Sequence, residues 1–158
     1  MIVLVGALIL AAARADPVGP TLPWGIHIAY GSDPSTELTV MWSTRAPVDG
    51  TFVRYGVADQ GELDEVTSGD AYTFQPFGSA EAQDLHLVRL AGLLPGTVYS
   101  YAVGSGIDGA GSSETFNFTT HPADPAGWVP TLAIFGDMGI SSNAQDTMVN
   151  LCVWTLDP

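Results

Sequence analysis

Between Pro23 and Thr120 the chain consists of short runs in which apolar and polar residues alternate, and turn-forming residues separate the runs. Such alternation is typical of half-buried β-strands, and the runs lack a helical period. We predict strands in six runs: WGIHIAY (24–30), ELTVMWST (37–44), TFVRYGV (51–57), DLHLVRL (84–90), TVYSYAVG (97–104) and ETFNFTT (114–120). Strands at this spacing, joined by turns rich in Gly and Pro, predict a two-sheet antiparallel β-sandwich.

The alternation also assigns side chains to faces. In the first two runs most of the apolar residues fall on one face, and these are Trp24, Ile26, Ile28, Tyr30, Leu38, Val40 and Trp42. The later segment LLPGTVYSYAVG resembles the fibronectin type III signature, in which Leu and Pro precede a strand-opening Tyr. In that fold the Tyr hydroxyl bonds back to nearby backbone, a role that Tyr99 fits. Trp42 fits the buried Trp of the second strand, so both residues are expected in the core.

The sequence contains three histidines, at positions 27, 86 and 121. His86 alternates with Val88 and Leu90, so it shares their apolar face, and we interpret it as a hydrogen-bonded structural residue rather than a ligand. His27 is expected to be exposed, and His121 precedes a Pro at a domain boundary. No two of them have the spacing of metal ligands.

The N-terminus reads as a secretory signal. Residues 1–15 hold an apolar stretch that ends in Ala-Arg-Ala, which predicts cleavage between Ala15 and Asp16. The stretch is short for a bilayer span, so we expect a secreted chain with no membrane span after cleavage. The alternatives are an uncleaved anchor and an unprocessed apolar start.

The net charge and the cysteine content exclude some classes of binding partner and an internal disulfide. Four Arg and no Lys face 17 acidic residues, for a net charge of −13, which argues against binding to nucleic acid or to an anionic membrane. With no basic cluster, a phosphate site in this protein would need a metal ion. The single cysteine, Cys152, cannot form an intramolecular disulfide.

One modification motif stands in the last predicted strand. Asn117-Phe118-Thr119 is an N-glycosylation sequon, and a strand that turns Phe116 and Phe118 inward turns Asn117 outward. We therefore predict a glycan at Asn117. An unused sequon is the alternative.

A change of pattern follows the sandwich. Residues 121–130 (HPADPAGWVP) read as a stiff Pro-rich linker, and TLAIF (131–135) is apolar without alternation, as expected of a strand covered on both faces. Gly-Asp-Met-Gly then turns the chain toward a predicted helix, which places Asp137 at the carboxyl end of a buried strand. A carboxylate there could bind a metal ion or simply cap the helix.

The order of these parts resembles the purple acid phosphatases, from about Pro23 to Asn150. Their plant and microbial members carry an N-terminal sandwich ahead of a binuclear metallophosphatase domain, and LAIFGDMGI resembles the first metal motif of that domain. The implied fold is mainly β: a fibronectin type III-like antiparallel β-sandwich (23–120), a linker (121–130) and the first strand–helix unit of an α/β metallophosphatase domain (131–158).

The resemblance also implies a function. The parent enzyme would hydrolyse phosphate monoesters with Fe³⁺ and a divalent ion (Zn²⁺, Mn²⁺ or Fe²⁺), and Asp137 would be a ligand of the ferric ion. The family's other ligands come from later motifs that these 158 residues do not contain, so we expect this chain alone to be inactive and to bind no metal tightly. The resemblance also allows a homodimer. The alternatives are a non-catalytic secreted binding module and a non-functional truncation product.

Overall fold

The computed structural model describes residues 19–75, 81–106, 111–126 and 128–129. Its strands are β1 (Trp24–Tyr30), β2 (Glu37–Thr44), β3 (Phe52–Val57), β4 (Glu65–Ser68), β5 (Asp70–Phe74), β6 (Gln83–Ala91), β7 (Val98–Gly104) and β8 (Phe116–Thr119). A short 3-10 helix, η1 (Ala58–Gln60), follows β3. The described residues contain no α-helix.

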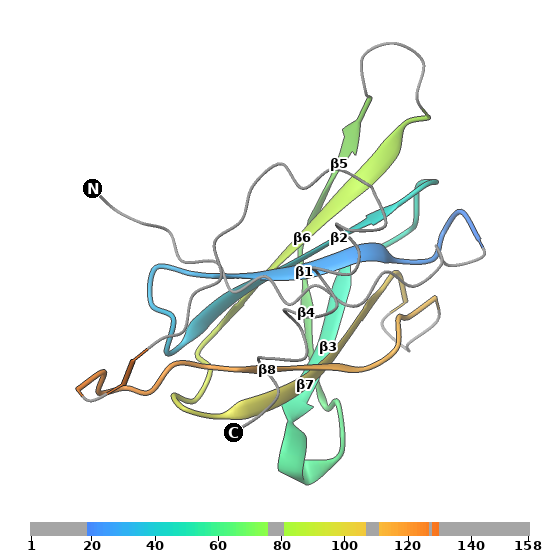
Figure 1. Ribbon diagram of the computed structural model, residues 1–158. Helices are drawn as coiled ribbons and strands as arrows, with labels where there is room; N and C mark the ends of the chain where they lie inside the picture. The colour runs from blue at the N-terminus through green and yellow to red at the C-terminus, as the bar shows by residue number, and fades with distance from the viewer. Residues whose placement is uncertain (1–18, 76–80, 107–110, 127, 130–158) are drawn as a thin grey trace, which may run out of the picture.

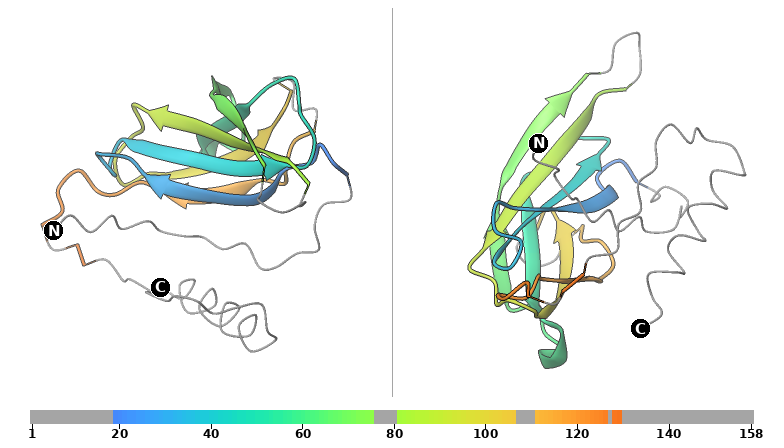
Figure 2. Two further views of the ribbon diagram at one scale, coloured as in Figure 1. Left: turned by 90° about the horizontal axis from the view of Figure 1, so that it is seen from above. Right: turned by 60° about the vertical axis from the view of Figure 1, so that its left-hand side comes forward.

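The strands form two four-stranded antiparallel sheets that pack face to face (Figures 1 and 2). One sheet has the order β1-β2-β6-β5, and the other has the order β4-β3-β7-β8. The arrangement confirms the predicted antiparallel β-sandwich. The predicted metallophosphatase unit lies outside the described residues.

The core lies between the sheets and is built from the alternate residues of the central strands. In β2 and β6 every second residue is buried, and Leu38, Val40, Val88 and Leu90 are fully covered. Each side chain of this size contributes roughly 1.5–3 kcal/mol relative to an exposed one. The alternation of apolar and polar residues in the sequence therefore matches the alternation of buried and more exposed residues in these strands.

A β-bulge changes the predicted face of one residue. The pairing of β1 with β2 shifts between Trp24 and His27, next to Gly25, whose φ is 61°. Trp24 consequently pairs with Ser43, on the outer face of the sheet, and its ring lies beside the guanidinium of Arg45 at 5.9 Å. Ile26 still packs against the core. The predicted common face of Trp24 and Ile26 is therefore wrong, because one extra residue reverses the alternation.

Strands β4 and β5 were not expected from the alternation, and they belong to different sheets. They are separated by Gly69, where the chain crosses from one sheet to the other. The Gly69 amide donates to the carbonyl of Thr51 at 3.0 Å, and a Cβ atom on Gly69 would collide with the carbonyl oxygen of Leu87. Glycine lets the backbone approach this closely. All five residues of β5 are exposed, and β5 is an edge strand of its sheet (Figure 1).

Candidate functional site

A buried histidine lies at the centre of the sandwich. His86 on β6 is 2% exposed, and its ring stacks on the indole of Trp42 with centroids 5.0 Å apart and planes 10° apart. Its two ring nitrogens face two threonines: Nε2 lies 3.0 Å from Thr44 Oγ1, and Nδ1 lies 2.9 Å from Thr51 Oγ1. The ring therefore connects the end of β2 with the residue that precedes β3.

The hydrogen bonds determine which nitrogen of the His86 ring carries the proton. The Thr44 hydroxyl donates to the carbonyl of Ala46 at 2.8 Å, so it accepts from His86 Nε2–H, and Nδ1 accepts from the Thr51 hydroxyl. Burial lowers the pKa of His86, and the nearby Asp84 carboxylate opposes this in part. Both nitrogens of the neutral ring are engaged, so neither offers a free lone pair to a metal. Sequence alternation identified His86 and Trp42 but neither threonine.

The Tyr99 side chain forms a tyrosine corner. It is 6% exposed, and its hydroxyl accepts a hydrogen bond from the amide of Leu94 at 2.9 Å. Its ring stacks on Phe118 with centroids 5.3 Å apart. A hydroxyl held in this way ties the turn before β7 to the strand that follows it.

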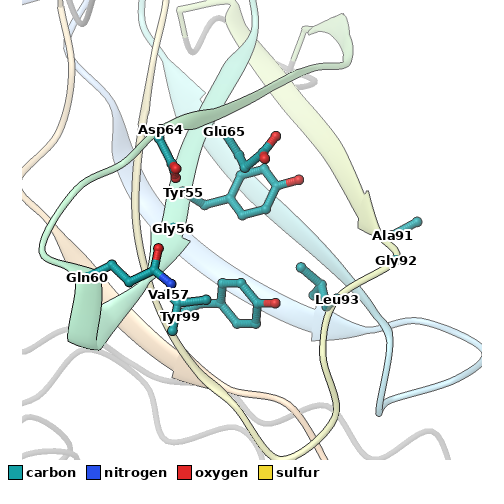
Figure 3. A pocket seen from close by; sticks show the side chains of 10 residues that line it. All are labelled: Tyr55, Gly56, Val57, Gln60, Asp64, Glu65, Ala91, Gly92, Leu93 and Tyr99. Carbon is teal, nitrogen blue, oxygen red and sulfur yellow. The ribbon is translucent and has the colours of Figure 1, made fainter.

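A shallow groove opens beside the same tyrosine (Figure 3). Its volume is about 370 Å³, and its walls include the rings of Tyr55 and Tyr99, the carboxylates of Asp64 and Glu65, and Gly92. Aromatic and acidic groups in this arrangement could contact a polar organic ligand. The residues that line the groove include no His, Cys, Ser or Thr.

A second aromatic cluster lies where the described chain leaves the sandwich, and we call Tyr30, His121 and Trp128 the exit cluster. The His121 ring lies between the other two, with both centroid distances at 4.3 Å. Burial lowers the pKa of His121. Trp128 remains 40% exposed. The sequence placed His121 at a boundary but did not reveal this packing, although the Trp within the Pro-rich segment was a usable signal.

Backbone hydrogen bonds hold the same segment against the sandwich. The His121 amide donates to the carbonyl of Pro34 in the β1–β2 turn at 3.0 Å, and the His121 carbonyl accepts from the amide of Gly96 at 2.8 Å. The turn itself is organised by Asp33, whose carboxylate accepts from the hydroxyl and amide of Ser35 and from Thr36. These bonds, that from the Ser35 hydroxyl foremost, lower the pKa of Asp33. The chain therefore leaves the sandwich at a residue, His121, whose backbone is held by hydrogen bonds.

The outward residue of the sequon lies on the edge strand β8. Asn117 is exposed, whereas Phe118 beside it is 3% exposed. The Ser100 hydroxyl on β7 donates to Asn117 Oδ1 at 2.8 Å.

Three other predicted positions lie outside the described residues: Ala15, Asp16 and Asp137. The described ranges contain no group of three or more His, Cys, Asp or Glu side chains that could hold a metal ion. They also contain no helix that is both long and apolar enough to cross a membrane.

Comparisons with known proteins identify the sandwich. Residues 23–120 match the model of the purple acid phosphatase N-terminal domain. Acid phosphatase type 7 of Mus musculus is 37% identical over 118 residues, and that of Homo sapiens is 36% identical over 121 residues. Each alignment covers 74% of this chain and 26% of the relative, so the chain spans about a quarter of the length of these curated relatives.

A solved structure shares the fold. The purple acid phosphatase PPD1 from yellow lupin (Lupinus luteus) seeds superposes with a TM-score of 0.52 at 22% identity, over 66% of this chain and 20% of that chain. The match of the family model covers most of the chain and coincides with the sandwich described above. This chain therefore belongs to the purple acid phosphatase family, of which it carries the N-terminal domain.

Proposed function

We propose that this chain is the N-terminal part of a secreted purple acid phosphatase that hydrolyses phosphate monoesters, and that the 158 residues alone are inactive. The observation that carries the proposal is the family match over residues 23–120, followed within the same chain by the Gly-Asp-Met-Gly turn. The relatives' name, acid phosphatase type 7, agrees with this activity.

The sandwich acts as an accessory domain in this proposal. Its central histidine is fully engaged by Thr44, Thr51 and Trp42, and its groove is lined by no His, Cys, Ser or Thr, which supports a non-catalytic role for it. Its contribution is mechanical. The exit cluster and the bonds of His121 support this role, because they hold His121 against the sandwich just ahead of the proposed following domain.

Asp137 is proposed as a metal ligand of the complete enzyme. Bound metal ions in such enzymes neutralise phosphoryl oxygens and supply a strong nucleophile from water. A carboxylate suits Fe³⁺ or a divalent partner such as Zn²⁺, Mn²⁺ or Fe²⁺. A single carboxylate is too few ligands for tight binding, because such sites need several ligands and their supporting partners.

The test compares the 158-residue chain with a longer chain that includes the whole metallophosphatase domain. We expect hydrolysis of an aryl phosphate, with bound iron, only in the longer chain. Asp137→Asn in the longer chain should lower both iron content and activity, while Asp64→Asn, a matched change in the sandwich groove, should leave both unchanged. Metal-dependent turnover by the short chain would contradict its inactivity, and full activity of Asp137→Asn would contradict the ligand assignment.

A non-catalytic binding module is the second candidate, and the groove of Tyr55, Tyr99, Asp64 and Glu65 favours it. The two candidates differ in metal content. A longer chain that binds no iron and hydrolyses no phosphate ester would favour the binding module.

A further inference from the structure

We propose that Asn117 is an N-glycosylation site and that its oligosaccharide covers the outer face of the sheet at the β8 edge. The inference rests on the proposed entry into the secretory pathway but not on phosphatase activity. Of the three asparagines in the chain, Asn117, Asn143 and Asn150, only Asn117 stands two residues before a Ser or Thr.

The strand presents the motif on a single face. Asn117 and Thr119 are both exposed, and the intervening Phe118 is buried in the core between them. Successive side chains of a strand point to opposite faces, so the acceptor and its threonine share the outer face. A glycan on Asn117 would therefore leave the packing of Phe118 on Tyr99 intact.

The chemistry of the side chain agrees with modification. The hydrogen bond that the structure gives to this side chain engages Oδ1, which accepts from the Ser100 hydroxyl. The sugar attaches to the other amide atom, Nδ2. In this step Nδ2 loses one proton and bonds the anomeric carbon of a lipid-linked oligosaccharide, and the lipid pyrophosphate is the leaving group. The Ser100 bond can persist beside the new linkage and orient it.

The surroundings leave room for a sugar. The outer-face residue that pairs with Asn117 on β7 is the small Ser100, and Ser100 pairs in turn with Gly56 on β3. Beyond Ser100 the outer side of Gly56 is covered by the carbonyl of Glu62, so the room for a sugar lies at Ser100 and at the β8 edge. Within the described sheet β8 is an edge strand, and exposed edges invite pairing with other chains. A glycan here would block such pairing through β8.

The test is expression of the chain, with its own N-terminus, in eukaryotic secretory cells. We expect peptide-N-glycosidase to lower its apparent mass and to convert Asn117 to Asp in the corresponding peptide. Asn117→Gln and Thr119→Ala should both abolish the shift, because each removes one half of the motif. Thr119→Ser should keep it, since a serine hydroxyl also completes a sequon.

A second variant shows whether the chain meets the glycosylating enzyme at all. Gly111→Asn places an acceptor two residues before Ser113 and so creates a new sequon. The position is exposed, and its φ of 66° is a conformation that asparagine tolerates. Modification at position 111 without modification of Asn117 would overturn the site itself. If neither position is modified, the chain does not enter that pathway, and the proposal falls together with the proposed secretion, whereas phosphatase activity is unaffected by either result.

Discussion

Two histidines of this sandwich contact aromatic rings, and they differ in what holds them. His86 lies at the centre, is 2% exposed and has a hydrogen-bond partner on each ring nitrogen. His121 lies at the chain exit between Tyr30 and a Trp128 that is 40% exposed, and its own backbone supplies the hydrogen bonds. His86 therefore connects strands inside the core, whereas His121 attaches the segment after β8 to the surface of the sandwich.

The largest loss of stability is expected from replacing Trp42, whose indole stacks on the His86 ring. Trp42→Ala should lower the free energy of unfolding of the chain by about 3–5 kcal/mol, because it removes a fully packed indole and leaves a cavity. Chemical denaturation followed by circular dichroism measures this. An unchanged midpoint would show that the stability of the sandwich does not depend on the stacking of Trp42 on His86. The proposed difference between the His86 and His121 regions would then be wrong.

Removing the polar contacts of the interior should have the next largest effect. His86→Leu puts an apolar side chain in the interior and leaves the Thr51 hydroxyl without the ring, at a cost of roughly 1–3 kcal/mol. The Thr44 hydroxyl also loses the ring but keeps its bond to the Ala46 carbonyl, so its loss adds less. Thr51→Val is the matched control, and it should cost less because it breaks one bond only. Equal losses for the two variants would mean that the Thr44 bond contributes nothing.

The pH dependence should separate the two histidines further. Burial lowers the pKa of His86 below its ordinary value of 6.5, so the unfolded chain takes up the proton first as the pH falls. Stability should therefore be complete above that value and decrease as the pH falls below it. Asp33 and Glu37, whose pKa values are lowered from 3.8 and 4.5, act at lower pH.

We expect denaturation midpoints to drop between about pH 7 and about pH 5 in the wild type. His86→Leu should remove more of this drop than His121→Leu, because His86 is the more enclosed. A wild-type midpoint that is constant over this range would contradict the assignment of a neutral buried ring.

The smallest effect is expected at the exit. Trp128→Ala should lower the free energy of unfolding by about 0.5–1 kcal/mol, in the range of a single aromatic pair. It should also raise the pKa of His121 toward its ordinary value, because one covering ring is gone. Nuclear magnetic resonance titration of the imidazole measures this. A loss as large as that of Trp42→Ala would erase the difference between the two regions.

Sequence alternation predicted the strands that have one covered face. The predicted 24–30 and 37–44 runs coincide with β1 and β2, because these strands have an inner face packed on the core and an outer face that is more exposed. Strands β4 and β5 escaped prediction because their residues are mostly exposed and carry no such pattern. Their positions depend on pairing with β3 and β6, which lie elsewhere in the chain.

The site was predictable in part for the same reason. His86 could be placed on the covered face from its own neighbours, but its partner Thr44 lies 42 residues away and Thr51 lies 35 residues away. Predicting such contacts requires knowing how the strands pair and how the two sheets pack. A hint was present, since Thr44 continues the inward alternation of Trp42 with a polar residue. Asp137 was proposed from its motif alone, and it lies outside the described residues.

The long separation of the threonine–histidine bonds also affects how the sandwich forms. Strand β2 pairs with β6 along its whole length, so it finds no sheet neighbour on that side until β6 has been made. With 42 residues between Thr44 and His86 and synthesis at roughly 5–20 residues per second, β2 waits about 2–8 s for its partner on the ribosome. Non-local pairing of this kind places the chain among slow-folding domains, and the apolar face of β2 is exposed to other chains during that interval.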